Sequence, residues 1–248
     1  MTMEAQRKHV KVNKMRPKNS QSRTVRCLIT GFDAFGKHAS NPSQRIAELL
    51  PNQFEIPRTN LSVEIDTLVI PTCCKQSWRL ISKQLAKDDY SSLIMVGMAG
   101  GRKRIALERF ALNIRDYGIK DNNGHKYDGT PIYEGEPEAL KTDLPLTHLR
   151  DTLRKKNIPA EVSNFAGSFI CNEVYYQGLR YKEKNGGLSS VLFVHVPQIK
   201  DLANTLVEAE HEEITAIKSP AARNKAALNL MTDCVQDIAA YCSKLSSS

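Results

Sequence analysis

The sequence predicts a single-domain, three-layer α/β/α sandwich, in which helices cover both faces of a mostly parallel, twisted sheet. Three apolar runs, at residues 25–30, 61–70 and 92–99, have the length of buried strands, and glycines follow the first and third runs. Helical patterns separate the runs, and the connections between them are short. A β-α-β-α-β order with short connections implies parallel strands with helices on both faces of the sheet.

The two helices of the first half are predicted from a cap and from a spacing. Asn41 and Pro42 supply an N-cap and a proline at the first helical position, so we expect a helix from there to about residue 50. Between residues 75 and 86, apolar side chains recur at helical spacing around Trp78. These two helices connect the three predicted strands.

The second half continues the alternation of strands and helices. Further strands are expected at residues 105–114 (one strand or a pair), 160–163 and 190–196. Further helices are expected at residues 146–156, from Phe169 or Cys171 to about 184, and at the C-terminus, where an apolar stripe repeats every four residues through Ala226, Leu230, Cys234, Ile238 and Cys242. The turn-rich residues 122–133 are predicted as a surface loop, and the acidic residues 202–214 are compatible with a surface helix.

The composition is that of an ordinary soluble protein. The chain has 248 residues, of which 41% are hydrophobic and 25% are charged, which suffices for a full core without disulfides. No apolar run reaches the roughly 18 residues of a membrane-spanning helix. No apolar stretch follows the basic N-terminus, so we expect no secretory signal peptide and a cytoplasmic location.

The net charge of +8 is concentrated at the N-terminus. Residues 1–24 contain seven Lys or Arg against Glu4 alone, a balance of +6, whereas residues 25–248 contain 28 Lys or Arg against 26 Asp or Glu, a balance of +2. We therefore expect a basic disordered tail over residues 1–24 and a catalytic domain over residues 25–248. The tail is interpreted as a solvated extension, and the alternative is a targeting or nucleic-acid-binding arm.

The six cysteines show no CxxC pair and no Cys/His spacing typical of a zinc site. Cys27 lies in a strand-like run, and Cys234 and Cys242 lie on a helical face, so these three are predicted to be small buried apolar residues. No metal and no cofactor are predicted.

Two glycine-containing segments resemble nucleotide-binding loops without meeting their requirements. Residues 31–37 match the first seven positions of a phosphate-binding loop, but His38 stands where a Ser or Thr is needed to hold magnesium. The two phenylalanines of this loop suit a flat apolar ligand better than a phosphate. Residues 97–101 are too short for a dinucleotide fingerprint.

Cys171 is the candidate nucleophile, because it lies between a short strand and the start of a helix. The helix N-terminus favours a thiolate, and its free N–H groups can bind the oxyanion of an attacked carbonyl. His195, at the end of its strand, is the best-placed base, although a lone histidine in an apolar strand is also typical of a hydrogen-bonded core residue. Glu108 interrupts an apolar strand, and its alternative role is an edge charge paired with Arg109. We expect these segments to converge at the carboxyl ends of the strands.

From Val25 onward the chain resembles the pyroglutamyl peptidase I (pyrrolidone-carboxylate peptidase) family of cysteine peptidases. The resemblance rests on residues 30–36, 41–42, 96–102, 107–109, 121–124, 162–172 and 193–197, in that order. It implies a catalytic triad of Glu108, Cys171 and His195. It also implies a pocket for the pyroglutamyl ring, with contributions from Phe32, Phe35, Asn41, Phe169 and Ile170.

The implied activity is hydrolysis of the bond after an N-terminal pyroglutamyl residue of a peptide, through an acyl-enzyme. Pyroglutamate is a flat, uncharged lactam that aromatic faces can hold and that fixed polar groups can distinguish from proline. The resemblance also implies a homodimer or homotetramer. No membrane partner is expected, and nucleic acid would be a partner only through the basic tail.

Three positions depart from the family pattern. Ala34 and Met98 replace residues common in the family, and both changes look tolerable. Gly118 stands where many bacterial members have an arginine, so another donor such as Arg115 would have to assist the oxyanion. The alternatives to an active peptidase are a weakened or specificity-shifted relative, or a nucleic-acid-binding protein that uses the tail.

Overall fold

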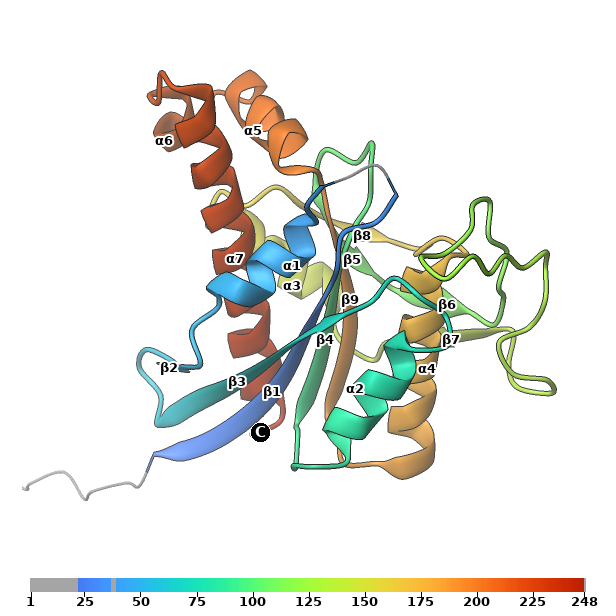
Figure 1. Cartoon of the computed structure of the whole chain (residues 1–248). Helices are drawn as coiled ribbons and strands as arrows, with labels where there is room; N and C mark the ends of the chain where they lie inside the picture. The colour runs from blue at the N-terminus through green and yellow to red at the C-terminus, as the bar shows by residue number, and fades with distance from the viewer. Residues whose placement is uncertain (1–21, 37–38, 248) are drawn as a thin grey trace, which may run out of the picture.

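The computed structural model describes residues 22–36 and 39–247, and its centre is a seven-stranded sheet. The strand order is β2-β3-β1-β4-β9-β5-β8 (Figure 1). Its strands are β1 (Arg23–Phe32), β2 (Gln53–Glu55), β3 (Leu61–Ile70), β4 (Ser92–Met98), β5 (Ile105–Glu108), β8 (Ala160–Ser163) and β9 (Ser190–Val196). A second sheet pairs β6 (Phe110–Leu112) with β7 (Ala139–Lys141).

Most neighbouring strands are parallel, which confirms the predicted architecture. The pairs β1–β3, β1–β4, β4–β9 and β5–β8 are parallel, whereas β2–β3 and β5–β9 are antiparallel. The sequence did not predict β2 or β7, because three residues are too few for a recognisable pattern.

Helices cover both faces of the sheet, as Figure 1 shows. The helices are α1 (Pro42–Leu49), α2 (Ser77–Leu85), α3 (Leu146–Arg154), α4 (Ile170–Asn185), α5 (Ile199–Glu208), α6 (Glu212–Thr215) and α7 (Pro220–Leu245). Buried side chains of α1, α3, α5, α6 and α7 form one hydrophobic core, and those of α2 and α4 form the other. Among the helices of the described residues, none has both the length and the apolar character needed to cross a bilayer.

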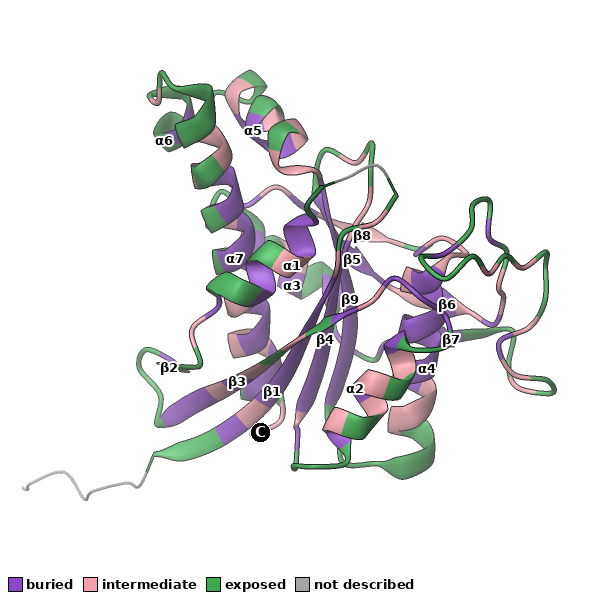
Figure 2. Ribbon diagram, viewed as in Figure 1, coloured by how far each residue is buried: buried purple, intermediate pink, exposed green. Residues whose placement is uncertain are grey.

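The central strands are buried on both faces, which explains their unbroken apolar runs. In β9, Leu192 and Val194 belong to the core under α7, whereas Val191 and Phe193 belong to the core under α4. The same alternation occurs in β1 and β4, and all three strands are buried over most of their length (Figure 2). Cys27, Cys234 and Cys242 are free and fully buried, as predicted.

The start of α1 follows from capping. The Asn41 side chain accepts a hydrogen bond from the Ser43 N–H at 3.1 Å, and Pro42 is the first residue of α1, as predicted. The predicted stretch 202–214 is instead two helices, because Glu210 adopts a positive φ of 54° between α5 and α6. Residues 1–21 of the predicted tail lie outside the described residues, but Arg23 and Thr24 already belong to β1.

Candidate active site

His195 and Glu108 form a hydrogen-bonded pair at one end of the sheet. His195 is near the carboxyl end of β9, and the antiparallel register of β5 and β9 places Ala106 opposite it. The Glu108 Oε1 lies 2.8 Å from the His195 Nδ1, and the Glu108 side chain is fully buried. Because a carboxylate only accepts hydrogen bonds, Nδ1 carries a proton, and Nε2 of the neutral ring is left as a base.

Cys171 is the second residue of α4, and its sulfur packs against β4 at Gly97. Gly97 of β4 is the register partner of His195. A Cβ atom added to Gly97 would lie 3.1 Å from the Cys171 Sγ and 2.8 Å from the Phe193 Cζ. A side chain at position 97 would therefore crowd both the Phe193 ring and the thiol at the position paired with His195. The sequence assigned no role to Gly97, although a glycine inside an apolar strand is a signal of close approach.

The resting form of Cys171 is a thiol. Burial, and then the negative charge of Glu108, raise the pKa of Cys171 to about 12, although its own main-chain N–H favours the thiolate. The helix N-terminus was expected to favour the thiolate, and its effect is outweighed by the apolar surroundings. The thiol therefore needs a base when it attacks a substrate.

The first turn of α4 is fixed by the two buried residues that follow Cys171. The Asn172 side chain accepts a hydrogen bond from the Leu112 N–H at 2.8 Å and donates to the carbonyls of Leu112 and Ile114 at 2.9 and 3.1 Å. Glu173 accepts hydrogen bonds from the Arg115 guanidinium, at 2.8 Å, and from the Tyr117 hydroxyl. These contacts hold the helix N-terminus in place, and no sequence pattern indicated them.

Arg115, the oxyanion donor considered from the sequence, already has both terminal nitrogens hydrogen-bonded to other groups. Its Nη2 is bonded to Glu173, and its Nη1 lies 3.2 Å from the Pro131 carbonyl oxygen. Gly118 is exposed, and a Cβ added there would meet no atom within 4 Å. Main-chain N–H groups in the first turn of α4 remain as oxyanion donors, because no earlier residue of the helix accepts from them.

Arg102 is a further member of the site that sequence reasoning missed. Its Nη2 lies 3.1 Å from the Glu108 Oε1 and 3.2 Å from both the Ser163 Oγ and the Phe165 carbonyl oxygen. Arg102 thus balances the charge of a buried carboxylate and links the site to the segment after β8. The signal that could have found it is its place in the 96–102 segment, directly after the β4 turn.

The expected pocket residues divide into two groups. Phe35 and Phe169 are partly exposed, and their ring centroids lie 5.3 Å apart; Phe169 also packs on Tyr117 at 4.7 Å. Phe32, Asn41 and Ile170 are buried, with exposed fractions of 2%, 4% and 0%. The structure thus places Phe35 and Phe169 beside the start of α4.

Two of the buried residues support the loop after β1. Phe32 packs against Phe193 at 6.4 Å between ring centroids. The Asn41 amide donates to the Asp33 carbonyl oxygen at 3.0 Å, in addition to capping α1.

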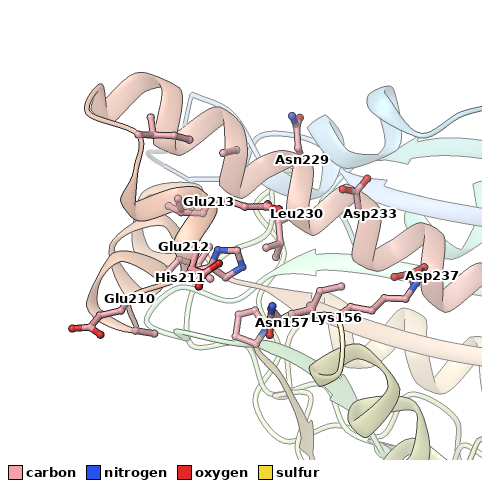
Figure 3. Close-up of a pocket in the computed structure, with 17 residues that line it drawn as sticks. Lys156, Asn157, Glu210, His211, Glu212, Glu213, Asn229, Leu230, Asp233 and Asp237 are labelled. Atoms are coloured by element: carbon pink, nitrogen blue, oxygen red, sulfur yellow. Dashed lines mark hydrogen bonds and ion pairs between the residues drawn. The ribbon is translucent and has the colours of Figure 1, made fainter.

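A cavity of about 970 Å³ lies away from this site, between α5, α6, α7 and the end of α3 (Figure 3). Its lining includes His211 and several carboxylates, and its Lys156 forms an ion pair with Asp237 at 2.6 Å. It has no cysteine, serine or threonine in its lining and contains none of Glu108, Cys171 and His195. The cavity therefore lacks a nucleophile for His211 to activate, and we do not assign the chemistry to it.

Arg102→Met should lower the free energy of unfolding by about 3 kcal/mol, because it leaves the buried Glu108 carboxylate without its cation. The same change in a Glu108→Gln background should cost clearly less, since no charge is then left unpaired. Urea unfolding of the unmodified protein, the two single variants and the double variant gives the four free energies of unfolding from which this coupling is calculated. Equal costs in both backgrounds would mean that Arg102 acts through its other contacts, with Glu161, Ser163 and Phe165, and not through Glu108.

Comparisons with known proteins agree with this geometry. The sequence model of the pyroglutamyl peptidase family matches residues 25–218. The pyrrolidone-carboxylate peptidase of Alkaliphilus oremlandii is 36% identical over 185 residues, which cover 73% of this chain and 84% of that protein. The pyrrolidone-carboxylate peptidase of Fusobacterium nucleatum is 38% identical over 176 residues, which cover 70% of this chain and 78% of that protein.

Solved structures give the same result. The pyrrolidone carboxyl peptidase of Fervidobacterium islandicum superposes with a TM-score of 0.71 at 31% identity, covering 86% of this chain and 95% of that chain. The pyroglutamyl peptidase I of Bacillus amyloliquefaciens superposes with a TM-score of 0.67 at 30% identity, covering 87% of this chain and 97% of that chain. With its fold, its matched segments and its relatives in agreement, this chain belongs to the pyroglutamyl peptidase family.

Proposed function

We propose that this protein is a cysteine peptidase that removes an N-terminal pyroglutamyl residue from peptides. The observation that carries the proposal is the packing of the Cys171 thiol at the β4 position paired with His195, whose imidazole is bonded to Glu108. Relatives named pyrrolidone-carboxylate peptidases support the substrate class. They also favour a peptidase over a protein that binds nucleic acid through its tail.

In the proposed mechanism, proton transfer accompanies attack. His195 Nε2 takes the proton of Cys171 as Sγ bonds to the pyroglutamyl carbonyl carbon, because the raised pKa of Cys171 leaves few preformed thiolates. Main-chain N–H groups at the start of α4 stabilise the oxyanion. His195 then gives its proton to the leaving amine, and water hydrolyses the thioester with His195 again as the base.

Glu108 and Arg102 have supporting roles in this scheme. Glu108 keeps Nδ1 protonated and stabilises the imidazolium that forms when His195 accepts a proton. Arg102 balances the charge of Glu108, since its Nη2 approaches the same carboxylate oxygen at 3.1 Å. Glu108 Oε2 has no partner among the described residues.

The substrate ring is proposed to bind against Phe35 and Phe169, the two partly exposed aromatics beside the nucleophile. The pocket is completed by three buried residues at the loop after β1 and at the start of α4: Phe32, Asn41 and Ile170. Main-chain groups of these segments would pair with the lactam N–H and carbonyl and so discriminate against proline.

A cytoplasmic location is proposed because all six cysteines, each in the described part of the chain, are free thiols. Assembly into a homodimer or homotetramer is a further proposal, which rests on the family resemblance alone.

Cys171→Ala and His195→Ala should each reduce turnover of a fluorogenic pyroglutamyl amide by roughly 10⁴-fold or more, because each removes a group that acts in bond formation. Glu108→Gln should cost less, roughly 10²-fold, since it alters only the orientation and stabilisation of the base. The reduced, purified protein is the test material. Full turnover in Cys171→Ala, or none in the unmodified protein, would refute the proposal.

Gly97→Ala should lower kcat strongly, because the new methyl group would overlap Phe193 and displace the Cys171 sulfur. Gly178→Ala is the matched control: its Cβ would meet the side chains of Met95, Leu93 and Val191 at 3.1–3.3 Å, with no contact to the thiol. Both changes crowd the same core, so both should lower stability. If kcat falls in proportion to the free energy of unfolding in both variants alike, Gly97 has no specific role in placing the thiol.

Alkylation of Cys171 by iodoacetamide should accelerate about tenfold per pH unit and show no plateau below pH 9, because the thiolate is the reactive form. The rate should rise with pH because the pKa of Cys171, about 12, lies above the ordinary value for a thiol, so the thiolate fraction still increases throughout this range. Mass spectrometry of the labelled peptide at each pH gives the rate for this thiol. A plateau between pH 6 and pH 8 would indicate a preformed thiolate–imidazolium pair instead.

A further inference from the structure

A second group of reactive side chains lies outside the catalytic site, at the loop that follows β3. Cys73 belongs to the connection between β3 and α2, and Asp121 and His125 come from a turn nearly fifty residues later. One ligand atom of each residue, the sulfur, a carboxylate oxygen and a ring nitrogen, lies within 4.8 Å of the other two. Cys73 and Asp121 are buried, whereas 28% of the His125 side chain is exposed.

The surrounding main chain holds the carboxylate of this group in place. Asp121 accepts hydrogen bonds from the main-chain N–H groups of Cys74, Asn123 and His125, at 3.1, 2.9 and 2.8 Å. Burial opposes ionisation of Asp121, but these donors outweigh it and lower its pKa to about 2. The Asn123 amide also donates to the Cys73 sulfur at 3.0 Å.

The spacing of the three groups is close to that of a metal-bound set. The His125 Nδ1 lies 3.2 Å from the Asp121 Oδ1, which is about the edge of a tetrahedron with metal–ligand bonds of about 2.0–2.1 Å. A sulfur at about 2.3 Å from the same metal is compatible with ligand atoms that lie within 4.8 Å of one another, provided that the group contracts on binding. A role for Asp121 in capping its turn explains the main-chain contacts, but it does not explain why a buried thiol adjoins the carboxylate and the imidazole.

We propose that Cys73, Asp121 and His125 form a binding site for a zinc-class divalent cation, with a fourth position open to water on the exposed side of His125. A sulfur ligand favours such an ion over magnesium or calcium, which prefer oxygen ligands. Binding releases the thiol proton. The cysteine spacing did not indicate this site, because its ligands come from two segments far apart in the sequence.

Both ligand-bearing segments also hold the loop that contains Phe32 and Phe35. The Asn122 amide donates to the Ala34 carbonyl oxygen at 3.1 Å, and the Thr72 N–H donates to the Asp33 Oδ1 at 2.8 Å. An ion that joins residue 73 to residues 121 and 125 would therefore restrain the loop from both sides. This site and the catalytic thiol are separate, so its test needs no activity measurement.

Cobalt(II) is the probe, since a cobalt–thiolate bond gives a charge-transfer absorption in the near ultraviolet. Titration of the reduced full-length Cys171→Ala protein, in which the catalytic thiol is absent, should show this band at one equivalent of cobalt. Cys73→Ser should abolish the band. Displacement of the bound cobalt by zinc measures the zinc affinity. His125→Ala, at a partly exposed position, should lower that affinity by at least about 10-fold.

Cys74→Ser is the matched control, because it removes the neighbouring thiol while keeping the main-chain N–H that Asp121 accepts. It should retain the band and the affinity. Absence of a sulfur–cobalt band in the Cys171→Ala protein, or its persistence in Cys73→Ser, would overturn the proposal. If Cys73→Ser fails to fold, His125→Ala still tests the site, because it changes a partly exposed residue and leaves the buried Cys73 and Asp121 in place. Unchanged zinc affinity in His125→Ala would then overturn the proposal.

Discussion

The close approach of Cys171 to the main chain at Gly97 is the contact on which the site depends. The absence of a side chain at Gly97 gives the thiol room against β4, and the residue opposite Gly97 is His195. A larger residue at position 97 would overlap the fully buried Phe193 as well as the sulfur. Strand register and helix packing thus meet at one position, and a shift of either would move Cys171 away from the strand position paired with His195.

Buried polar contacts keep that geometry fixed. Asn172 and Glu173 tie the first turn of α4 to the segment from Leu112 to Tyr117, and Arg102 ties Glu108 to the segment after β8. Such groups cost free energy when they are removed from water, so they favour the one arrangement in which each finds its partner. Burial at this position, and then the charge of Glu108, also raise the pKa of Cys171.

The loops around the site are linked to one another as well as to the sheet. The Asn122 side chain contacts the loop after β1, and the same turn contains Asp121, which accepts from the main chain of Cys74. Phe35, Phe169 and Tyr117 join three separate segments through ring contacts. A ligand that orders any one of these segments would therefore restrain the others.

The sequence by itself determined most strands of the main sheet, β2 excepted, and most of the helices that cover it, because buried strands and amphipathic helices leave local patterns. The apolar runs at 61–70, 160–163 and 190–196 match β3, β8 and β9 in full, and the Asn41-Pro42 signal marks the start of α1. The family motifs also indicated Glu108, Cys171 and His195 before any geometry was known, although their catalytic roles stay predictions.

Only the tertiary structure decided how these elements meet. The antiparallel placement of β5 beside β9 brings Glu108 to His195, and no local pattern encodes that pairing. The partners of Arg102, Asn172 and Glu173, the raised pKa of Cys171, and the meeting of Cys73 with His125 have the same origin. Periodicity records which face of an element is buried, whereas the identity of a distant neighbour depends on the packing of the whole chain.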